Sequence, residues 1–263
     1  MMDYDCVVLD IEGTTTSIAF VHDILFPYVL RVLDDFLKQN WSEPELQLLV
    51  DALRKQAEED VGQHVKEANR IPSNSSAHEI QDAVAASVRW QMKQDRKAGP
   101  LKAFQGFVWR YGYAQGELKG HVYSDVVPAL ERWKKAGKDI YIYSSGSIEA
   151  QKLIFGFSDA GNLLLYFKGH FDTGIGMKIE TSSYTKIAKK IHHSPSRILF
   201  VSDNVNEIRA AVGGGLQVAI TDRPGNAPID SKRDAAGQVT CLVAGQSVHV
   251  VKSFDELFSN SKL

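Results

Sequence analysis

Two acidic residues stand directly after the first apolar run of the sequence. In the stretch VVLDIEGTTT, Asp10 and Glu12 are followed by Gly13 and three threonines. A buried carboxylate is costly unless a cation or hydrogen bonds keep it ionised, and two neighbouring carboxylates repel each other unless a cation or a shared proton intervenes. A lone aspartate in this place is about as often an ordinary turn or helix-cap residue. The glycine and Thr14–Thr16, which can contact an anion through their amides or hydroxyls, favour a site for a cation and an anion.

Polar residues follow three later apolar stretches in a similar way. Ser144 and Ser145 come after the run YIY and precede an expected helix, whose first amides and positive dipole end attract anions. Taken alone, this pattern is more often a plain serine helix cap. Lys178 lies in a glycine-rich loop, where a lone lysine is usually just solvated. Asp203 ends the apolar stretch ILFVS, where it could equally cap the next helix.

The residues at these four places together are those that phosphoryl transfer requires. A carboxylate nucleophile attacks phosphorus, a cation and a lysine neutralise the phosphate oxygens, and hydroxyl and amide donors fix the geometry. Mg²⁺ is the expected cation, because it prefers oxygen ligands and bridges to substrate phosphate. The sequence therefore predicts a Mg²⁺-dependent site for a small phosphate ester, if the fold brings together the side chains of residues 10, 144, 178 and 203.

Short apolar runs alternate with amphipathic helical patterns around these residues. The expected strands are Cys6–Leu9, Ile140–Tyr143, Ile198–Val201, Val218–Ile220 and a less apolar candidate at Val248–Val251. The expected helices are Val126–Ala136, Ile148–Phe155, Tyr184–Ile191 and Asn206–Val212. Alternation of this kind predicts an α/β fold with a parallel sheet covered by helices on both faces. Ligands in such sheets bind beyond the carboxyl ends of the strands, which is where the polar residues fall.

A long segment without strand patterns interrupts this alternation. It contains a helical pattern over Ile24–Phe36, capping boxes at Ser42–Glu45 and Ser76–Glu79, an exposed loop over Gly62–Ser75 and a helix over Leu101–Gln115. We therefore expect an α/β catalytic core of residues 1–16 and 122–263, with an all-helical cap of residues 17–121. Such a cap can close over a site, exclude water and select substrates by shape.

The bulk composition narrows the classes of partner. Thirty basic and 32 acidic residues among 263 give a net charge of -2, which predicts no strong attraction for nucleic acid or membranes. Cys6 and Cys241 are far apart, which argues against a disulfide framework and suits a reducing compartment. The sequence opens on no signal-peptide pattern and has no apolar run near the ~18 residues of a membrane span. We expect a cytoplasmic monomer, and its size leaves entry into the nucleus open.

The motifs together resemble those of the haloacid dehalogenase superfamily of phosphatases. They are VVLDIEGTT, IYIYSSG, Lys178 and ILFVSDNVNE. More narrowly, the chain resembles the enolase-phosphatases of methionine salvage, through Glu12 where most members of the superfamily carry aspartate, and through GHFDTGIGMKIETSSYTKIA and DRPGNAP. The resemblance covers nearly the whole chain. It implies a Rossmann-like core with a helical cap inserted after the first strand.

The resemblance also implies roles for individual residues. Asp10 would be the nucleophile that forms an aspartyl-phosphate, and Glu12 would protonate the leaving oxygen and later activate water. Lys178 would balance the charge of the phosphate and of Asp10. The implied substrate-binding residues are Ser144, Ser145 and Lys178, and the implied ligands of one Mg²⁺ per subunit are Asp10, Glu12 through its carbonyl, and Asp203. Because Asn204 stands where many members have a second acid, Glu207 is expected to give support through water or Lys178.

The implied reaction has two parts. The enzyme enolises 2,3-diketo-5-methylthiopentyl 1-phosphate and then removes the phosphate, which leaves the acireductone 1,2-dihydroxy-3-keto-5-methylthiopentene. The group that takes the proton in the first part stays open. A Mg²⁺-dependent phosphatase of the same superfamily for another small organophosphate is the main alternative. A signalling receiver domain is much shorter and places its aspartate on an internal strand, and a silent binding protein has no physical reason to keep all four charged residues.

Overall fold

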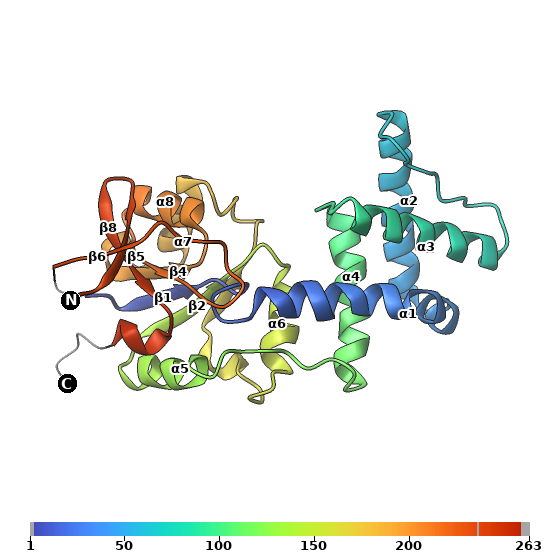
Figure 1. Ribbon diagram of the computed structural model, residues 1–263. Coiled ribbons are helices and arrows are strands. Elements are labelled where there is room, and N and C mark those ends of the chain that lie inside the picture. Colours follow the sequence, from blue (N-terminus) through green and yellow to red (C-terminus); the bar gives the residue numbers. More distant parts are fainter. Residues whose placement is uncertain (1–2, 236, 259–263) are drawn as a thin grey trace. The chain divides into compact units, whose positions relative to one another are not determined.

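The computed structural model describes residues 3–235 and 237–258 of the chain (Figure 1). The chain divides into two compact units, one made of Met1–Val21 and Lys119–Leu263 and the other of His22–Leu118. The second unit is a few residues shorter at each end than the expected 17–121 cap. Within the described part of the chain, no helix combines the length and the apolar character that crossing a membrane requires.

The first unit is built on one sheet, which has eight strands in the described ranges, in the order β3-β2-β1-β4-β5-β8-β7-β6. The strands are β1 (Cys6–Leu9), β2 (Asp139–Tyr143), β3 (Gly169–Phe171), β4 (Ile198–Ser202), β5 (Gln217–Thr221), β6 (Lys232–Arg233), β7 (Val239–Val243) and β8 (Gln246–Val251). The six strands from β3 to β8 in this order are parallel, and β7 and β6 continue the sheet in antiparallel pairing. The predicted α/β fold is confirmed, with a mixed edge in place of a wholly parallel sheet.

The antiparallel edge arises from a tight hairpin. Val243 pairs with Gln246, so that only Ala244 and Gly245 connect β7 to β8. Both connecting residues have positive φ angles, 50° and 79°, as a two-residue type I′ turn requires. This turn matches the twist of the strands and allows β8 to pair directly with the preceding β7. A parallel neighbour would need a long crossover connection.

Helices connect the strands and cover the sheet. They are α5 (Val126–Lys135), α6 (Ile148–Gly156), α7 (Thr181–Lys190) and α8 (Val205–Gly213). Figure 1 shows α7 and α8 on one side of the strands and α5 on the other. All four helices and all five strands expected from the sequence are present with small differences in their ends, whereas β3, β6 and β7 were not expected.

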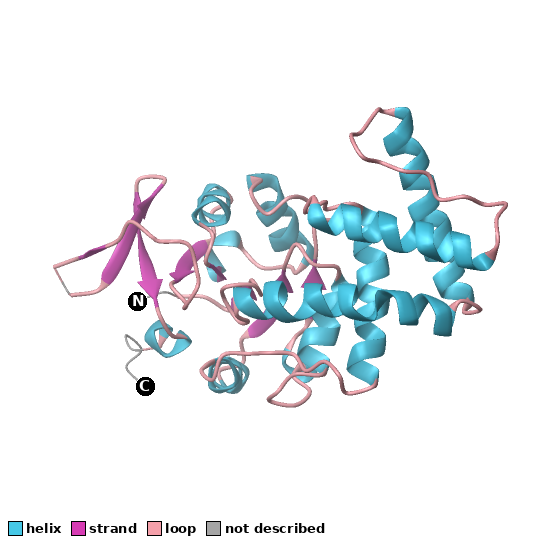
Figure 2. Ribbon diagram, turned by 45° about the vertical axis from the view of Figure 1, so that its right-hand side comes forward, coloured by secondary structure: helices cyan, strands magenta, loops and turns pink. Residues whose placement is uncertain are grey.

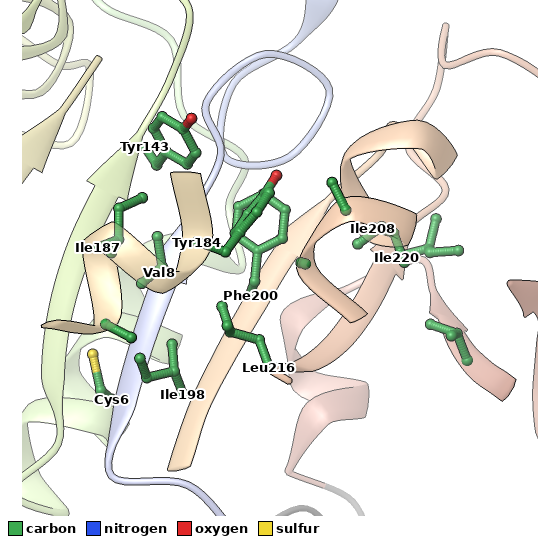
Figure 3. Close-up of a cluster of buried hydrophobic side chains, with 14 of the residues drawn as sticks. Cys6, Val8, Tyr143, Tyr184, Ile187, Ile198, Phe200, Ile208, Leu216 and Ile220 are labelled. Carbon is green, nitrogen blue, oxygen red and sulfur yellow. The ribbon is translucent and has the colours of Figure 1, made fainter. Parts of the chain in front are cut away.

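The central strand β1 is buried along its whole length, as expected for a parallel strand covered on both faces. Cys6 and Val8 point into a cluster on one face, which also contains Tyr184 of α7 and Phe200 of β4 (Figure 3). Alternation along the strand sends Val7 and Leu9 to the other face, where they are equally buried. The strand is therefore held from both sides, and the residue that follows it has a fixed position.

The regular elements of the second unit, residues 22–118, are all helices, which are joined by loops (Figure 2). A π-helix, Phe20–Leu25, leads into α1 (Phe26–Asn40), followed by α2 (Pro44–Gly62), α3 (Ala77–Lys93) and α4 (Gly99–Ala114). The capping box at Ser76 and Glu79 is confirmed. The box expected at Ser42 is wrong, because Pro44 opens α2 and makes Glu43 the N-cap residue, without a side-chain cap hydrogen bond.

Candidate active site

Asp10 is the residue after β1 and is only 4% exposed. Its N–H donates to the carbonyl of Val201 at 3.0 Å, which extends the pairing of β1 with β4 to this residue. Its Oδ1 accepts a hydrogen bond from the N–H of Ile11 at 2.7 Å. Because the chain turns to β2 and β3 on one side of β1 and to β4 and β5 on the other, the carboxylate lies where the strand order reverses. This is the usual ligand site in such sheets.

The loop after Asp10 is a compact turn around one carbonyl group. The N–H groups of Thr14, Thr15 and Thr16 lie 3.2, 2.9 and 2.8 Å from the carbonyl oxygen of Ile11. Gly13 has a φ of 70°, and a Cβ at this position would lie 2.6 Å from Oδ2 of Asp203. Glycine is therefore required by the backbone conformation and by the approach of the second aspartate.

The threonine hydroxyls have a structural role that differs from the expected one. All three threonines are fully buried, and their hydroxyl groups bond to the protein. The partners are Thr221 Oγ1 for Thr14 at 3.1 Å, the Asp10 carbonyl for Thr15 at 3.2 Å and the His121 carbonyl for Thr16 at 2.7 Å. These hydroxyls therefore fix the loop on the sheet, and the expectation that they contact an anion is wrong for them.

Lys178 lies between two carboxylates in the loop after β3. Its Nζ is 2.5 Å from Oδ1 of Asp10 and 2.7 Å from Oε2 of Glu207, and its side chain is 5% exposed. The hydroxyl of Tyr184 donates to the Lys178 carbonyl at 2.6 Å, which anchors the loop to α7. Burial opposes the ammonium charge, but the carboxylates of Asp10 and Glu207 outweigh it and raise the pKa of Lys178. The lysine is therefore a fixed positive charge beside the carboxylate of Asp10.

Ser202 makes a second connection between the same two acids. Its Oγ lies 3.1 Å from Oδ2 of Asp10 and 2.8 Å from Oε2 of Glu207. It also accepts a hydrogen bond from the N–H of Asn204 at 3.1 Å. Burial and the charge of Asp10 raise the pKa of Glu207. Because a hydroxyl has one proton, Ser202 can donate to one of these two acids at a time.

Asp203 follows β4, the neighbour of β1. Its expected alternative role as a helix cap is excluded, because Asn204 is the N-cap residue of α8 and its side chain accepts from the N–H of Asn206. Burial and the nearby carboxylates of Asp10 and Glu207 raise the pKa of Asp203 to about 7. Three acidic groups thus meet near one ammonium group, and a divalent cation would relieve the repulsion between them.

The donor set suits Mg²⁺ better than a transition metal. Residues 3–235 and 237–258 contain no group of three or more His, Cys, Asp or Glu side chains that could hold a metal ion without other ligands. The ion would therefore have to take some of its ligands from other groups. The expected ligands are two carboxylates, those of Asp10 and Asp203, and one carbonyl, that of Glu12. Mg²⁺ accepts such a set because it retains several waters and takes further oxygens from a substrate phosphate. The residues present therefore fit the expected ion.

The serine pair follows β2, on the other side of β1. Ser144 is 8% exposed, its N–H donates to the Phe171 carbonyl at 3.1 Å, and its Oγ accepts from the N–H of Gly146 at 3.2 Å. Ser145 is exposed. The plain cap that the sequence left open belongs to Ser147, whose Oγ accepts from the N–H of the third helical residue. Ser144 and Ser145 thus precede the helix at the same sheet edge as Asp10.

Sequence reasoning missed several residues that build this site. Arg223 lies in the loop after β5, where its Nη1 and Nη2 donate to Asp125 at 3.0 and 2.8 Å and its Nε donates to the Thr14 carbonyl at 3.3 Å. Asn226 and Ser202 were also missed. Arg223 and Asn226 lie in DRPGNAP and Ser202 directly precedes Asp203, so all three lie in stretches that carry the resemblance, but their residue types alone indicated no role in the site.

Comparisons with known proteins agree with this geometry. Residues 4–215 match the family model of the haloacid dehalogenase-like hydrolases. A protein of Anopheles gambiae named enolase-phosphatase E1 is 50% identical over 226 residues, which are 86% of this chain and 76% of that protein. A protein of Xenopus tropicalis with the same name is 47% identical over 247 residues, 92% of this chain and 93% of that protein.

A solved structure extends the comparison to the fold. The crystal structure of the UTR4 protein of Saccharomyces cerevisiae has a TM-score of 0.72 and 31% sequence identity, and the match covers 96% of this chain and 99% of that one. This chain belongs to the haloacid dehalogenase-like hydrolases and, within them, to the enolase-phosphatase family. The resemblance read from the motifs is confirmed, and the protein is a phosphatase of the methionine salvage type.

Proposed function

We propose that this enolase-phosphatase converts 2,3-diketo-5-methylthiopentyl 1-phosphate to 1,2-dihydroxy-3-keto-5-methylthiopentene and phosphate through an aspartyl-phosphate on Asp10, with Mg²⁺ as its cofactor. The observation that carries this mechanism is the position of Lys178, which bridges Asp10 and Glu207 in a buried site at the end of β1. The family of the relatives supports the choice of substrate.

The dephosphorylation proceeds in two displacements. A carboxylate oxygen of Asp10 forms a bond to phosphorus as the bond between phosphorus and the substrate oxygen breaks, and Glu12 gives its proton to that oxygen. Glu12 then takes a proton from water, whose oxygen attacks the phosphorus of the aspartyl-phosphate. Phosphate leaves, and Asp10 is again a carboxylate. Lys178, held at 2.5 Å from Asp10, stabilises the negative charge in both displacements.

The remaining residues position the substrate and the cofactor. Ser144, Ser145 and Lys178 bind the phosphate oxygens, and the carboxylates of Asp10 and Asp203 with the Glu12 carbonyl hold one Mg²⁺. When bound, this ion neutralises phosphate charge and makes the proton beside the substrate carbonyl more acidic.

The test follows both parts of the reaction in one experiment. The protein is mixed with the diketo phosphate and Mg²⁺, and ultraviolet absorbance and released phosphate are recorded together. We expect an enol signal that gives way to acireductone as phosphate appears, and no phosphate with Asp10→Asn. Asp82→Asn, which changes a 69% exposed aspartate of α3, should behave like the wild type. A protein that releases phosphate from an aryl phosphate but gives neither ultraviolet signal with the diketo phosphate would contradict the proposed substrate.

A further inference from the structure

Asn226 lies close to the cation site but has no part in the mechanism above. It follows β5 within the stretch DRPGNAP. Its Nδ2 donates to the carbonyl of Gly13 at 2.9 Å and to the carbonyl of Thr221 at 3.1 Å. The two carbonyl acceptors fix the orientation of the amide, because exchanging its nitrogen and oxygen would place oxygen against oxygen.

The other end of this amide is buried without a partner. Oδ1 of Asn226 has no hydrogen-bond partner among the described residues. Buried polar atoms are nearly always hydrogen-bonded, so an unpaired oxygen at this place calls for a donor from outside the chain. The amide is therefore fixed with a free acceptor that points away from the two carbonyls.

The position of Gly13, in the loop after Asp10, shows where Oδ1 of Asn226 lies. A Cβ on Gly13 would lie 2.8 Å from Oδ1 of Asn226 and 2.6 Å from Oδ2 of Asp203. Oδ1 of Asn226, after β5, and Oδ2 of Asp203, after β4, thus lie against the same side of one glycine. Both only accept hydrogen bonds when the carboxyl is ionised, as it would be beside a cation. A water molecule with two protons can donate to such acceptors, and Mg²⁺ in a protein usually keeps several waters.

We propose that Asn226 is a positioning residue of the cation site, whose Oδ1 accepts a hydrogen bond from a water ligand of the Mg²⁺ held by Asp10 and Asp203. Its Nδ2 at the same time holds the carbonyl of Gly13, so that the loop after the nucleophile and the hydration of the ion are fixed by one amide. This inference rests on the proposed function, because it requires the Mg²⁺ site. Groups of this kind orient the ligands of a metal and commonly change its affinity about 10- to 100-fold when removed.

The experiment measures binding of Mg²⁺ alone to the full chain by calorimetry. Asn226→Ala removes both ends of the amide, and we expect Mg²⁺ to bind about 10- to 100-fold more weakly. Asn226→Asp loses the Nδ2 donor but keeps an acceptor, and we expect it to bind Mg²⁺ at least as tightly as the wild type. The added charge also attracts the cation, and salt screens a buried charge only weakly, so the informative result in this variant is whether affinity is lost. Asn206→Ala, at an exposed asparagine of α8, is the control and should leave the affinity unchanged.

The outcomes separate this inference from the proposed function. A purely structural role predicts equal losses for Asn226→Ala and Asn226→Asp, because both lose the bonds to Gly13 and Thr221, and that result would overturn the inference. Wild-type affinity in Asn226→Ala would overturn it as well. If Asn226→Ala does not fold, the affinity of Asn226→Asp decides alone, and a loss there overturns the inference. A wild-type protein that binds no Mg²⁺ would instead remove the cation from the proposed function.

Discussion

At the scale of single residues, the ammonium group of Lys178 has two carboxylate neighbours and almost no exposure to water. An ammonium group in such surroundings stabilises developing charge far more than a solvated lysine does, because the low local dielectric strengthens the interaction. The same contact orients Asp10, since one of its oxygens is held by Lys178 and the other by Ser202. The carboxylate that we propose as the nucleophile is therefore held in one orientation.

Replacing this lysine tests the electrostatic argument. Lys178→Met keeps most of the side-chain volume but removes the charge, and we expect kcat to fall about 10²- to 10³-fold, as when a preorganised stabilising group is lost. Steady-state kinetics with the diketo phosphate measure the change. Lys186→Met, at an exposed lysine of α7, is the control and should keep full activity. A kcat near the wild-type value in Lys178→Met would show that its charge is not used.

Glu12 offers a separate test, because two different parts of one residue are assigned two roles. The carboxyl group is assigned to proton transfer and the carbonyl to the cation, so Glu12→Gln should affect only the first. We expect kcat to fall about 10²- to 10⁴-fold, the usual contribution of a positioned acid or base. Calorimetric affinity for Mg²⁺ should stay close to that of the wild type. Unchanged turnover would exclude Glu12 as the acid and base.

At the scale of elements, the loop after β5 is tied to the start of α5 through a buried ion pair. Asp125 accepts from both Nη atoms of Arg223 and from the N–H of Phe254 at 2.6 Å. Burial opposes the charge of Asp125, but Arg223 and the Phe254 N–H outweigh it and lower its pKa. The guanidinium also donates to the Thr14 carbonyl, so this ion pair helps to hold the loop after Asp10 in place.

The lowered pKa gives a stability prediction with a definite sign. A carboxyl whose folded pKa lies below its unfolded value, which is about 3.9, stabilises the fold above that pH and loses this contribution as the pH falls through the folded pKa. At pH 7 we expect Asp125→Asn to lower the free energy of unfolding by about 3 kcal/mol, since it leaves Arg223 buried without its partner charge.

Urea unfolding at several pH values checks this prediction. The difference between the wild type and Asp125→Asn should shrink as the pH is lowered below about 4. Asp255→Asn removes an exposed partner of Arg132 and should change the stability by less than about 1 kcal/mol at any pH. A difference for Asp125→Asn that stays constant down to acid pH would exclude the ion pair as its source.

The elements also explain which parts of the fold the sequence predicts. β1 and β4 are continuous buried apolar runs, so their pattern is unmistakable. β3 has three residues, Gly169–Phe171, of which only the last is buried, so it lacks such a pattern. Its existence depends on pairing with β2. A strand defined by its neighbour cannot be found from its own composition.

The same distinction holds for the site. Asp10, Lys178 and Asp203 have the residue types and the loop positions that signal chemistry, and each was predicted. Asn226 and Ser202 are ordinary polar residues by type. Asn226 binds Gly13 across 213 positions of sequence, and Ser202 reaches Asp10 across 192. Their importance comes from contacts that only the folded sheet creates.

At the scale of the whole molecule, the proposed cation site belongs to one unit alone. All the expected Mg²⁺ ligands lie in the unit of Met1–Val21 and Lys119–Leu263, whereas His22–Leu118 contributes none of them. A ligand that binds only the folded state stabilises it by mass action, by about 2.7 kcal/mol at a concentration 100 times its Kd. The ion should therefore stabilise the two units to different extents.

Hydrogen exchange with and without Mg²⁺ can resolve this difference. We expect Mg²⁺ to slow exchange in the loops after β1 and β4, because their opening would break the bonds to the ion. Amides of α2 and α3 that exchange by local opening should keep their rates. Asp203→Asn should abolish the gain, since it removes one of two carboxylate ligands, whereas Asp82→Asn should retain it. Slowing that persists in Asp203→Asn, or that is confined to His22–Leu118, would place the ion elsewhere and remove Asp203 from the site.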